Sequence, residues 1–258
     1  ESCKNRQSGF MSREWPMQVR AFLLAVAFTL ASVPFAASGR TESTAPSAGF
    51  CETQDSKQCQ AAVTPQQVLE RFKQGNERFA SGHGTHRNYA QQVRATAKGQ
   101  YPLASIVSCI DSRAPAEILF DQGIGDLFNA RVAGNIVNED ILGSLEFASK
   151  IAGSKLVIVL GHTSCGAVKG ACDNVQMGNL TGLLARIMPA VAAIPNTGQD
   201  RSSKNYAFVE AVAEINVQQN VQLIRDRSPI LKELEDNGEI KIVGAMYDVA
   251  TGNVSWYD

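Results

Sequence analysis

Two short stretches of the chain each place soft metal ligands directly after a run of apolar residues. Cys109 follows the strand-like run 103–107, and His162 and Cys165 follow the run 155–160. Because the carboxyl ends of parallel strands meet at one edge of a sheet, we expect the three side chains to lie close together. Two thiolates and one imidazole form a ligand set suited to zinc, and they leave one coordination position open.

A carboxylate and a guanidinium lie beside the first of these ligands. Asp111 and Arg113 follow Cys109 at intervals of two residues, a spacing that allows a bidentate, charge-assisted pair. Such a pair would keep the carboxylate ionised near the metal, where it could accept a hydrogen bond from zinc-bound hydroxide. A structural ion pair at the start of a helix is the alternative, because aspartate also suits the positive end of the helix dipole.

The order and spacing of the motifs resemble those of the β-class carbonic anhydrases, from about Thr64 to the C-terminus. The matching motifs are Cys109-x-Asp111-x-Arg113, Phe120-Asp121-Gln122-Gly123, Arg131-x-Ala133-Gly134-Asn135 and His162-x-x-Cys165-Gly166. The resemblance implies a zinc enzyme that interconverts carbon dioxide and bicarbonate by attack of zinc-bound hydroxide. Cys109, His162 and Cys165 would hold the zinc, and Asp111 with Arg113 would orient the hydroxide.

The same resemblance implies residues that bind the substrate. Gln100 stands nine residues before Cys109, at the position of a glutamine that the family supplies across a dimer interface. Phe128, Ala133 and Phe147 correspond to an apolar pocket for carbon dioxide, although all three also suit a hydrophobic core. We therefore expect a homodimer or a dimer of dimers, with carbon dioxide and bicarbonate as small-molecule partners.

One branch of the resembled family binds regulatory bicarbonate with a tryptophan three residues before the first cysteine. In that branch the aspartate leaves its arginine and moves onto the zinc. Here Ile106 occupies the tryptophan position, and we interpret Arg131, which matches the arginine of the regulatory pocket, as structural. We therefore expect Asp111 to stay paired with Arg113.

The elements that position these residues alternate between strand and helix, which predicts a parallel sheet with right-handed crossovers. The expected fold is α/β, with a central, mostly parallel sheet of about four strands, an added edge strand and flanking helices. Strands are expected at 103–107, 126–132, 155–160 and 239–247, with a turn and a final edge strand over 248–254. The later helices are expected at 180–194, 206–225 and 229–236.

The N-terminal part of the chain has the pattern of a secretory signal. Arg20 introduces a continuous apolar run over 21–31, and small residues follow at 36–39. An amphipathic or buried helix is the alternative. We expect 1–38 to be removed, which would leave an exported, periplasmic protein with no membrane segment in its mature form.

A polar segment, 39–63, separates this signal from the expected catalytic domain, 64–258. Its Ser, Thr, Ala and Gln residues predict a flexible lead-in. Cys51 and Cys59 in this segment could pair in an oxidising compartment or stay free, since spacing alone does not establish a disulfide.

The composition favours small molecules or proteins as partners. The net charge is −1, and 44% of the residues are hydrophobic. The chain therefore lacks the excess of basic residues that would predict binding to nucleic acid or to a membrane surface.

Two other functions stay open. One is hydrolysis of carbon disulfide or carbonyl sulfide, which are linear like carbon dioxide; the other is a non-catalytic zinc-binding role, against which intact Asp111 and Arg113 argue.

Overall fold

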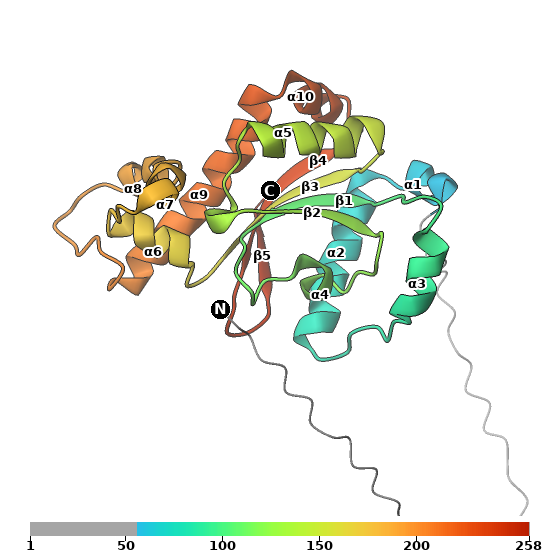
Figure 1. Cartoon of the computed structure of the whole chain (residues 1–258), viewed down its shortest axis with the longest axis horizontal. Coiled ribbons are helices and arrows are strands. Elements are labelled where there is room, and N and C mark those ends of the chain that lie inside the picture. Colours follow the sequence, from blue (N-terminus) through green and yellow to red (C-terminus); the bar gives the residue numbers. More distant parts are fainter. Residues whose placement is uncertain (1–55, 258) are drawn as a thin grey trace, which may run out of the picture. The chain divides into compact units, whose positions relative to one another are not determined.

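Five short segments enriched in apolar residues pair into one sheet in the computed structural model, which describes residues 56–257 (Figure 1). The strands are β1 (Ala104–Ser108), β2 (Leu127–Arg131), β3 (Leu156–His162), β4 (Lys241–Tyr247) and β5 (Val254–Tyr257). Their order is β2-β1-β3-β4-β5; the first four are parallel, and β5 pairs antiparallel with β4. The predicted parallel sheet with an added edge strand is confirmed.

Helices connect the strands and cover the sheet. In the described part of the chain the α-helices are α1 (Lys57–Ala62), α2 (Pro65–Ala80), α3 (Tyr89–Thr96), α4 (Ala116–Leu119), α5 (Glu139–Glu146), α6 (Gly166–Cys172), α7 (Gly178–Leu184), α8 (Met188–Ala193), α9 (Tyr206–Arg227) and α10 (Pro229–Asp236). A 3₁₀ turn, η1 (Ala133–Asn135), follows β2, and a π-helical turn, η2 (Phe147–Ile151), extends α5.

Successive residues of the two central strands point to opposite faces of the sheet. Val107 and Val159 lie in the core formed with α5, α9 and α10, whereas Ile106 and Ile158 lie in the core formed with α2 and α4. Figure 1 shows α5 and α10 on one side of the sheet and α2 and α4 on the other. Every residue of β1 and β3 is buried, as expected for parallel strands that are covered on both faces.

Helix α9 approaches the sheet closely because one residue in β3 and one in β4 lack a side chain. A Cβ atom at Gly161 would lie 2.5 Å from Val217 Cγ2, and one at Gly244 would lie 2.8 Å from Val217 Cγ1. Both distances are too short for van der Waals contact, so glycine is required at these positions. Val217 of α9 therefore sits directly on the two strands.

The prediction of a flexible lead-in through residue 63 is wrong for residues 57–62, which form α1. The buried side chain of Gln60 donates hydrogen bonds of 2.8 Å to the carbonyl oxygens of Pro102 and Ala152. These tertiary contacts order a segment whose composition suggests flexibility. Cys59 is disulfide-bonded, whereas Cys51 lies outside the described residues, so the pairing of these two cysteines stays a prediction.

The single helix expected over 180–194 is divided into α7 and α8. A turn at 185–187 separates them, and Pro189 lies in the first turn of α8. Proline is tolerated there because the first amide groups of a helix have no intrahelical acceptor, whereas inside a longer helix it would remove a hydrogen bond.

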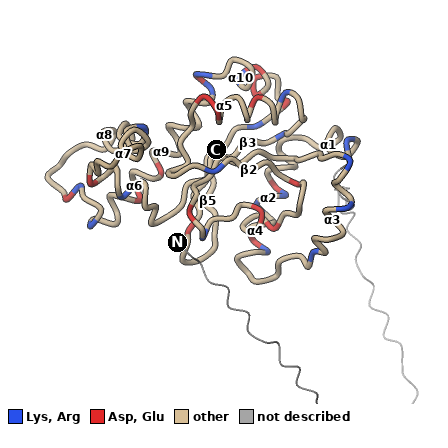
Figure 2. The backbone as a smooth tube through the Cα atoms, in the orientation of Figure 1, with Lys and Arg blue, Asp and Glu red and all other residues tan. Residues whose placement is uncertain are grey.

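The predicted secretory signal lies outside the described residues. Among residues 56–257, no helix combines the length and the apolar character needed to cross a bilayer. Figure 2 shows basic and acidic residues interspersed around α5 and α10.

Candidate metal centre

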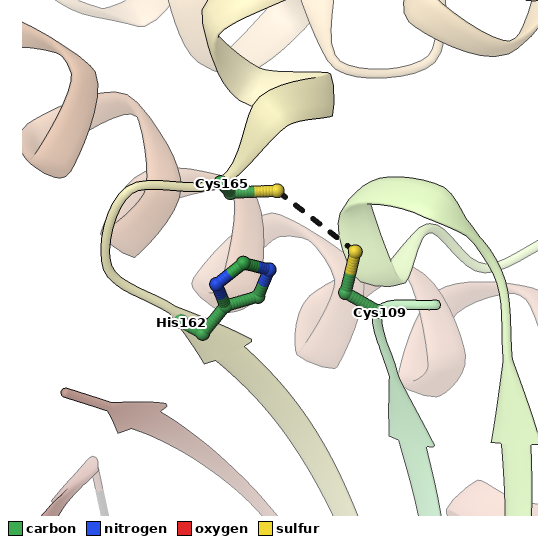
Figure 3. A group of neighbouring side chains, drawn as sticks. All are labelled: Cys109, His162 and Cys165. Carbon is green, nitrogen blue, oxygen red and sulfur yellow. Dashed lines mark hydrogen bonds between the residues drawn. The ribbon is translucent and has the colours of Figure 1, made fainter. Parts of the chain in front are cut away.

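Three ligand-type side chains converge at the carboxyl ends of β1 and β3 (Figure 3). Cys109 directly follows β1, His162 is the last residue of β3, and Cys165 immediately precedes α6. The last residue of β1, Ser108, pairs with Leu160, two residues before the end of β3, so the ligands that follow the two strands lie near each other. The sulfur atoms of the cysteines lie 4.0 Å apart, and the ligand atoms of all three buried residues lie within 4.8 Å of one another. The structure thus brings together the predicted ligand set.

The imidazole of His162 is oriented as a metal ligand. Its Nδ1 lies 2.9 Å from the carbonyl oxygen of Thr163, and since a carbonyl only accepts, Nδ1 carries the proton. The lone pair therefore resides on Nε2, which is buried and has no hydrogen-bond partner among the described residues. A buried, unpartnered lone pair beside two thiols fits a zinc ion, whose histidine ligands usually donate their other N–H to a carbonyl or carboxylate.

The two thiols differ in acidity because they share one hydrogen bond. The two sulfur atoms share this hydrogen bond, and the sulfur of Cys109 also accepts the backbone N–H of Gly134 at 3.3 Å. These bonds lower the pKa of Cys109 despite its burial. The shared bond and burial raise the pKa of Cys165. Cys109 therefore ionises first, and the second thiolate requires a cation to replace the shared proton.

Asp111 and Arg113 form the bidentate pair that their spacing predicts. Arg113 Nε donates to Asp111 Oδ1 at 2.9 Å, and Nη2 donates to Oδ2 at 2.7 Å. The backbone N–H of Arg113 also donates to Oδ1 at 2.9 Å. These bonds hold the pKa of the Asp111 carboxyl well below its usual range. Because Oδ2 lies 3.8 Å from His162 Nε2, an ionised carboxylate adjoins the ligand set.

Arg131, at the end of β2, fixes the turn that carries Cys109 and Asp111. Its Nε donates to the carbonyl oxygen of Cys109 at 2.9 Å, and its Nη2 donates to that of Asp111 at 2.6 Å. The two bonds span Ile110, whose side chain is exposed. Arg131 is therefore structural, as interpreted from the sequence.

Comparison with known proteins identifies the family of this chain. The model of a family described as carbonic anhydrase matches residues 104–254. Carbonic anhydrase 2 of Mycobacterium tuberculosis is 36% identical over 196 residues, which cover 74% of this chain and 91% of that protein. The solved β-carbonic anhydrase CafA of Aspergillus fumigatus is 25% identical, with a TM-score of 0.56 and coverage of 75% and 90%. The chain belongs to the β-carbonic anhydrase family.

The general activity of β-carbonic anhydrases is the hydration of carbon dioxide, and they are zinc enzymes. A β-carbonic anhydrase of Sordaria macrospora, described as tetrameric, shares the fold of this chain. It is 21% identical, with a TM-score of 0.57 and coverage of 74% of this chain and 96% of that one.

Of the three residues expected to form a carbon dioxide pocket in this β-carbonic anhydrase, two line one groove of the described subunit and Ala133 does not. Ala133 begins η1 and adjoins Gly134, the residue that donates its N–H to Cys109. Phe128 and Phe147 instead contact each other, with ring centroids 6.4 Å apart. They line an open groove of about 780 Å³ beside β2 and α5, and no predicted zinc ligand lines it.

Gln100 lies away from the ligand set of its own subunit. It is exposed and precedes β1, whereas Cys109 follows that strand. Gln100 lines a small pocket of about 250 Å³ together with Thr96, Tyr101 and Ile124. Within one subunit, the structure therefore does not bring this glutamine to the site.

Two residues that hold the loops around the candidate zinc ligands were not predicted from the sequence. Glu210 accepts the backbone N–H of Ser164, and Asn216 donates to the carbonyl oxygen of Gly134. Both belong to α9, far along the chain from either loop. Their sequence signal is weak, because a polar residue in a helix whose buried positions are mostly apolar does not reveal which loop it contacts.

Proposed function

We propose that this chain binds one zinc ion through Cys109, His162 and Cys165 and catalyses the reversible hydration of carbon dioxide to bicarbonate. The proposal rests on the buried Nε2 atom of His162, which has no described partner, lies among two thiols and is 3.8 Å from an ionised carboxylate. Zinc bound there would act as a Lewis acid and make water nucleophilic near neutral pH.

Asp111 would orient the reacting oxygen. Arg113 and its own backbone amide hold both carboxylate oxygens, and an ionised carboxylate can only accept hydrogen bonds. An O–H group that enters the site must therefore turn its hydrogen toward Asp111 and leave a lone pair free to attack carbon dioxide. Arg131 keeps the carboxylate in place through the turn on which it lies.

The test combines metal analysis with stopped-flow hydration of carbon dioxide. The purified protein should contain one zinc per subunit, lose activity when a chelator removes the zinc, and regain it when zinc is restored. Sulfide release from carbon disulfide or carbonyl sulfide, measured on the same sample, checks the rival hydrolase. A zinc-loaded protein that hydrates carbon dioxide no faster than buffer would instead be a non-catalytic homologue.

We propose further that the functional unit is a homodimer, or a dimer of such dimers, formed at the β2 edge of the sheet. Among residues 56–257, β2 pairs with β1 alone. Large apolar side chains are exposed nearby: Phe147 by 54%, Ile151 by 73% and Ile118 by 56%. Such exposure beside an open groove is typical of an interface. A relative described as tetrameric adds support.

Light scattering tests this interface. Phe147→Glu places a charge in the groove and should shift the protein to monomers. Met177→Glu is the matched control, because Met177 is also exposed, by 64%, but lies between α6 and α7; it should leave the assembly unchanged. An intact assembly of the Phe147→Glu variant would exclude this surface.

We also propose that Gln100 acts in the site of the partner subunit, since it cannot reach its own. Mixing two inactive variants tests this directly. In a mixed dimer of Gln100→Ala and Cys165→Ser subunits, one site has its own Cys165 and the partner's intact Gln100. Activity should therefore return on mixing under conditions that exchange subunits. If Gln100 acted within its own subunit, every site would stay defective.

We propose that the protein is exported to the periplasm. The apolar run 21–31 after Arg20 supports a secretory signal, and the disulfide-bonded state of Cys59 suits an oxidising compartment. Expression in a Gram-negative host, fractionation and mass analysis should find a chain that begins near residue 39 in the periplasm. A full-length chain in the cytosol would contradict export.

A further inference from the structure

Helix α9 carries three polar residues on a face that is otherwise apolar. Asn216 is 1% exposed and Asn220 is 6% exposed, and Glu210 has one carboxylate oxygen, Oε2, that is buried without a partner among the described residues. Burying polar groups is unfavourable unless hydrogen bonds compensate. The bonds that these side chains form therefore indicate what they stabilise.

Glu210 holds the loop between two of the candidate zinc ligands. Its Oε1 accepts the backbone N–H of Ser164 at 2.8 Å. Ser164 has φ 56°, a left-handed conformation that is unfavourable for a residue with a side chain. Figure 3 shows the consequence: the chain turns outward after His162 and returns so that the sulfur of Cys165 faces Cys109.

Asn216 holds the loop beside the remaining ligand. Its Nδ2 donates to the carbonyl oxygen of Gly134 at 2.9 Å, and the N–H of Gly134 donates to Cys109 Sγ at 3.3 Å. Asn220 supports this arrangement because its Nδ2 donates to Asn216 Oδ1 at 3.1 Å, while its Oδ1 accepts the N–H of Val137 at 2.8 Å. The η1 turn and the segment that follows it are thus each attached to α9 at one point, Gly134 and Val137.

The two attachments share one rigid support. Glu210 and Asn216 are six residues apart, which corresponds to about 9 Å along a helix. Val217 fills the space above Gly161 and Gly244, so α9 cannot move along the sheet without a steric clash. The separation between the Ser164 loop and the η1 turn is therefore fixed by a single helix.

We propose that Glu210 and Asn216 are positioning residues that set the distance between the thiols of Cys165 and Cys109 for zinc. This inference rests on the zinc site of the proposed function and assigns part of its affinity to α9. Loss of such a supporting contact typically weakens metal binding about 10- to 100-fold. Loss of either the Glu210 or the Asn216 contact should by itself let the distance between the thiols vary. The variant that lacks both contacts should therefore bind zinc less weakly than the product of the two separate losses in affinity would predict.

Competition with a chromogenic chelator measures zinc affinity in the full-length protein. Glu210→Ala should weaken zinc binding at least about 10-fold, whereas Glu210→Gln, which retains the acceptor for the Ser164 N–H, should stay within about threefold of wild type. Glu235→Ala is the control, because Glu235 also accepts a backbone N–H, that of Ile242, and otherwise pairs with Arg225 in the last turn of α9, at the opposite end of the helix from Glu210. It should lower stability without changing zinc affinity.

Cobalt substitution provides a second measurement. The thiolate-to-cobalt absorption reports on the position of the sulfurs, so it should change in Glu210→Ala and Asn216→Ala but not in Glu210→Gln or Glu235→Ala. Glu210→Asp, which keeps the charge but shortens the side chain, should behave like Glu210→Ala and provides a folded test if the alanine variant fails to fold.

Three outcomes are distinguishable. Zinc binding and cobalt spectra that are unchanged in Glu210→Ala or Glu210→Asp would overturn the inference. A glutamine variant as weak as the alanine variant would also overturn it, since charge rather than the hydrogen bond would then matter. Wild-type protein that binds no zinc would instead refute the proposed function, on which the inference rests.

Discussion

Asp121 connects α2 and the loop that follows it to the end of α4, and its replacement by asparagine should destabilise the protein. The carboxylate side chain is only 4% exposed. It accepts bonds from Arg78 Nε at 2.6 Å, from the backbone N–H of Thr85 at 3.0 Å and from the hydroxyl of Thr85 at 2.8 Å. Arg87 Nη1 forms a further ion pair with it.

The pKa of Asp121 gives the size of the effect. Burial alone would raise this pKa, but the hydrogen bonds from Arg87, Arg78 and Thr85 outweigh it and lower the pKa to about 2, from an ordinary value of 3.8. At roughly 1.4 kcal/mol per pKa unit, the ionised form contributes about 2 kcal/mol. Asparagine would also leave Arg87, which is 14% exposed, without its counter-charge. We therefore expect a loss of about 3 kcal/mol at pH 7.

The lowered pKa of Asp121 determines how its contribution to stability depends on pH. Because the folded pKa is lower than the unfolded pKa, the contribution is complete above the unfolded value of 3.8 and disappears as the pH falls toward about 2. The advantage of wild type over Asp121→Asn should thus be constant from pH 7 to about 5 and then narrow.

Urea unfolding followed by circular dichroism at several pH values, with equal protein concentrations, measures this difference. Asp236→Asn is the control, because Asp236 is 58% exposed and pairs with Lys232 on the surface; it should cost no more than about 0.5 kcal/mol. The reasoning is refuted if Asp121→Asn costs less than about 1 kcal/mol at pH 7, or if its effect is unchanged well below pH 4.

Three further predictions concern the site. Cys165→Ser should lose zinc and activity together, because zinc prefers thiolate, while Cys172→Ser should retain both; metal analysis that finds full zinc in the former would exclude Cys165 as a ligand. Asp111→Asn should keep most of its zinc but hydrate carbon dioxide ~10²-fold more slowly, and near-wild-type rates would make Asp111 structural. Arg131→Met should loosen the turn that carries Cys109 and Asp111 and so lower kcat roughly 10-fold. Stopped-flow rates at equal zinc content measure this change, and an unchanged kcat would contradict the role of Arg131.

The ligand set could be predicted from the sequence because its information is local. Cys109, His162 and Cys165 each follow a strand-like run, and neighbouring parallel strands bring their carboxyl ends together. Asp111 and Arg113 are close enough in sequence to pair within one turn. Residue type and distance from the strand end were therefore sufficient for these five residues.

The remaining contacts depend on tertiary packing that local patterns do not encode. Glu210 and Asn216 reach the site only because glycines in β3 and β4 let α9 lie close to the sheet. Phe128 is paired with Ser105, early in β1, so its position along the strand places it in the groove with Phe147 rather than at the carboxyl edge. Gln100 precedes β1, whereas the candidate ligand Cys109 follows that strand. No pattern within one chain shows which residues a second subunit supplies.

The anchoring of α1 determines where the chain can be shortened. Without Gln60, the carbonyl oxygen of Pro102 would keep only the hydroxyl of Ser154 as a donor, at 3.3 Å, and that of the half-buried Ala152 would lose its bond from Gln60. These bonds lie at the entrances to β1 and β3, and the loss of a typical hydrogen bond costs about 0.5–1.5 kcal/mol. A recombinant fragment that begins at Thr64 would contain every candidate zinc ligand and still be destabilised. A minimal catalytic fragment should therefore begin no later than Ser56, the residue that caps α1.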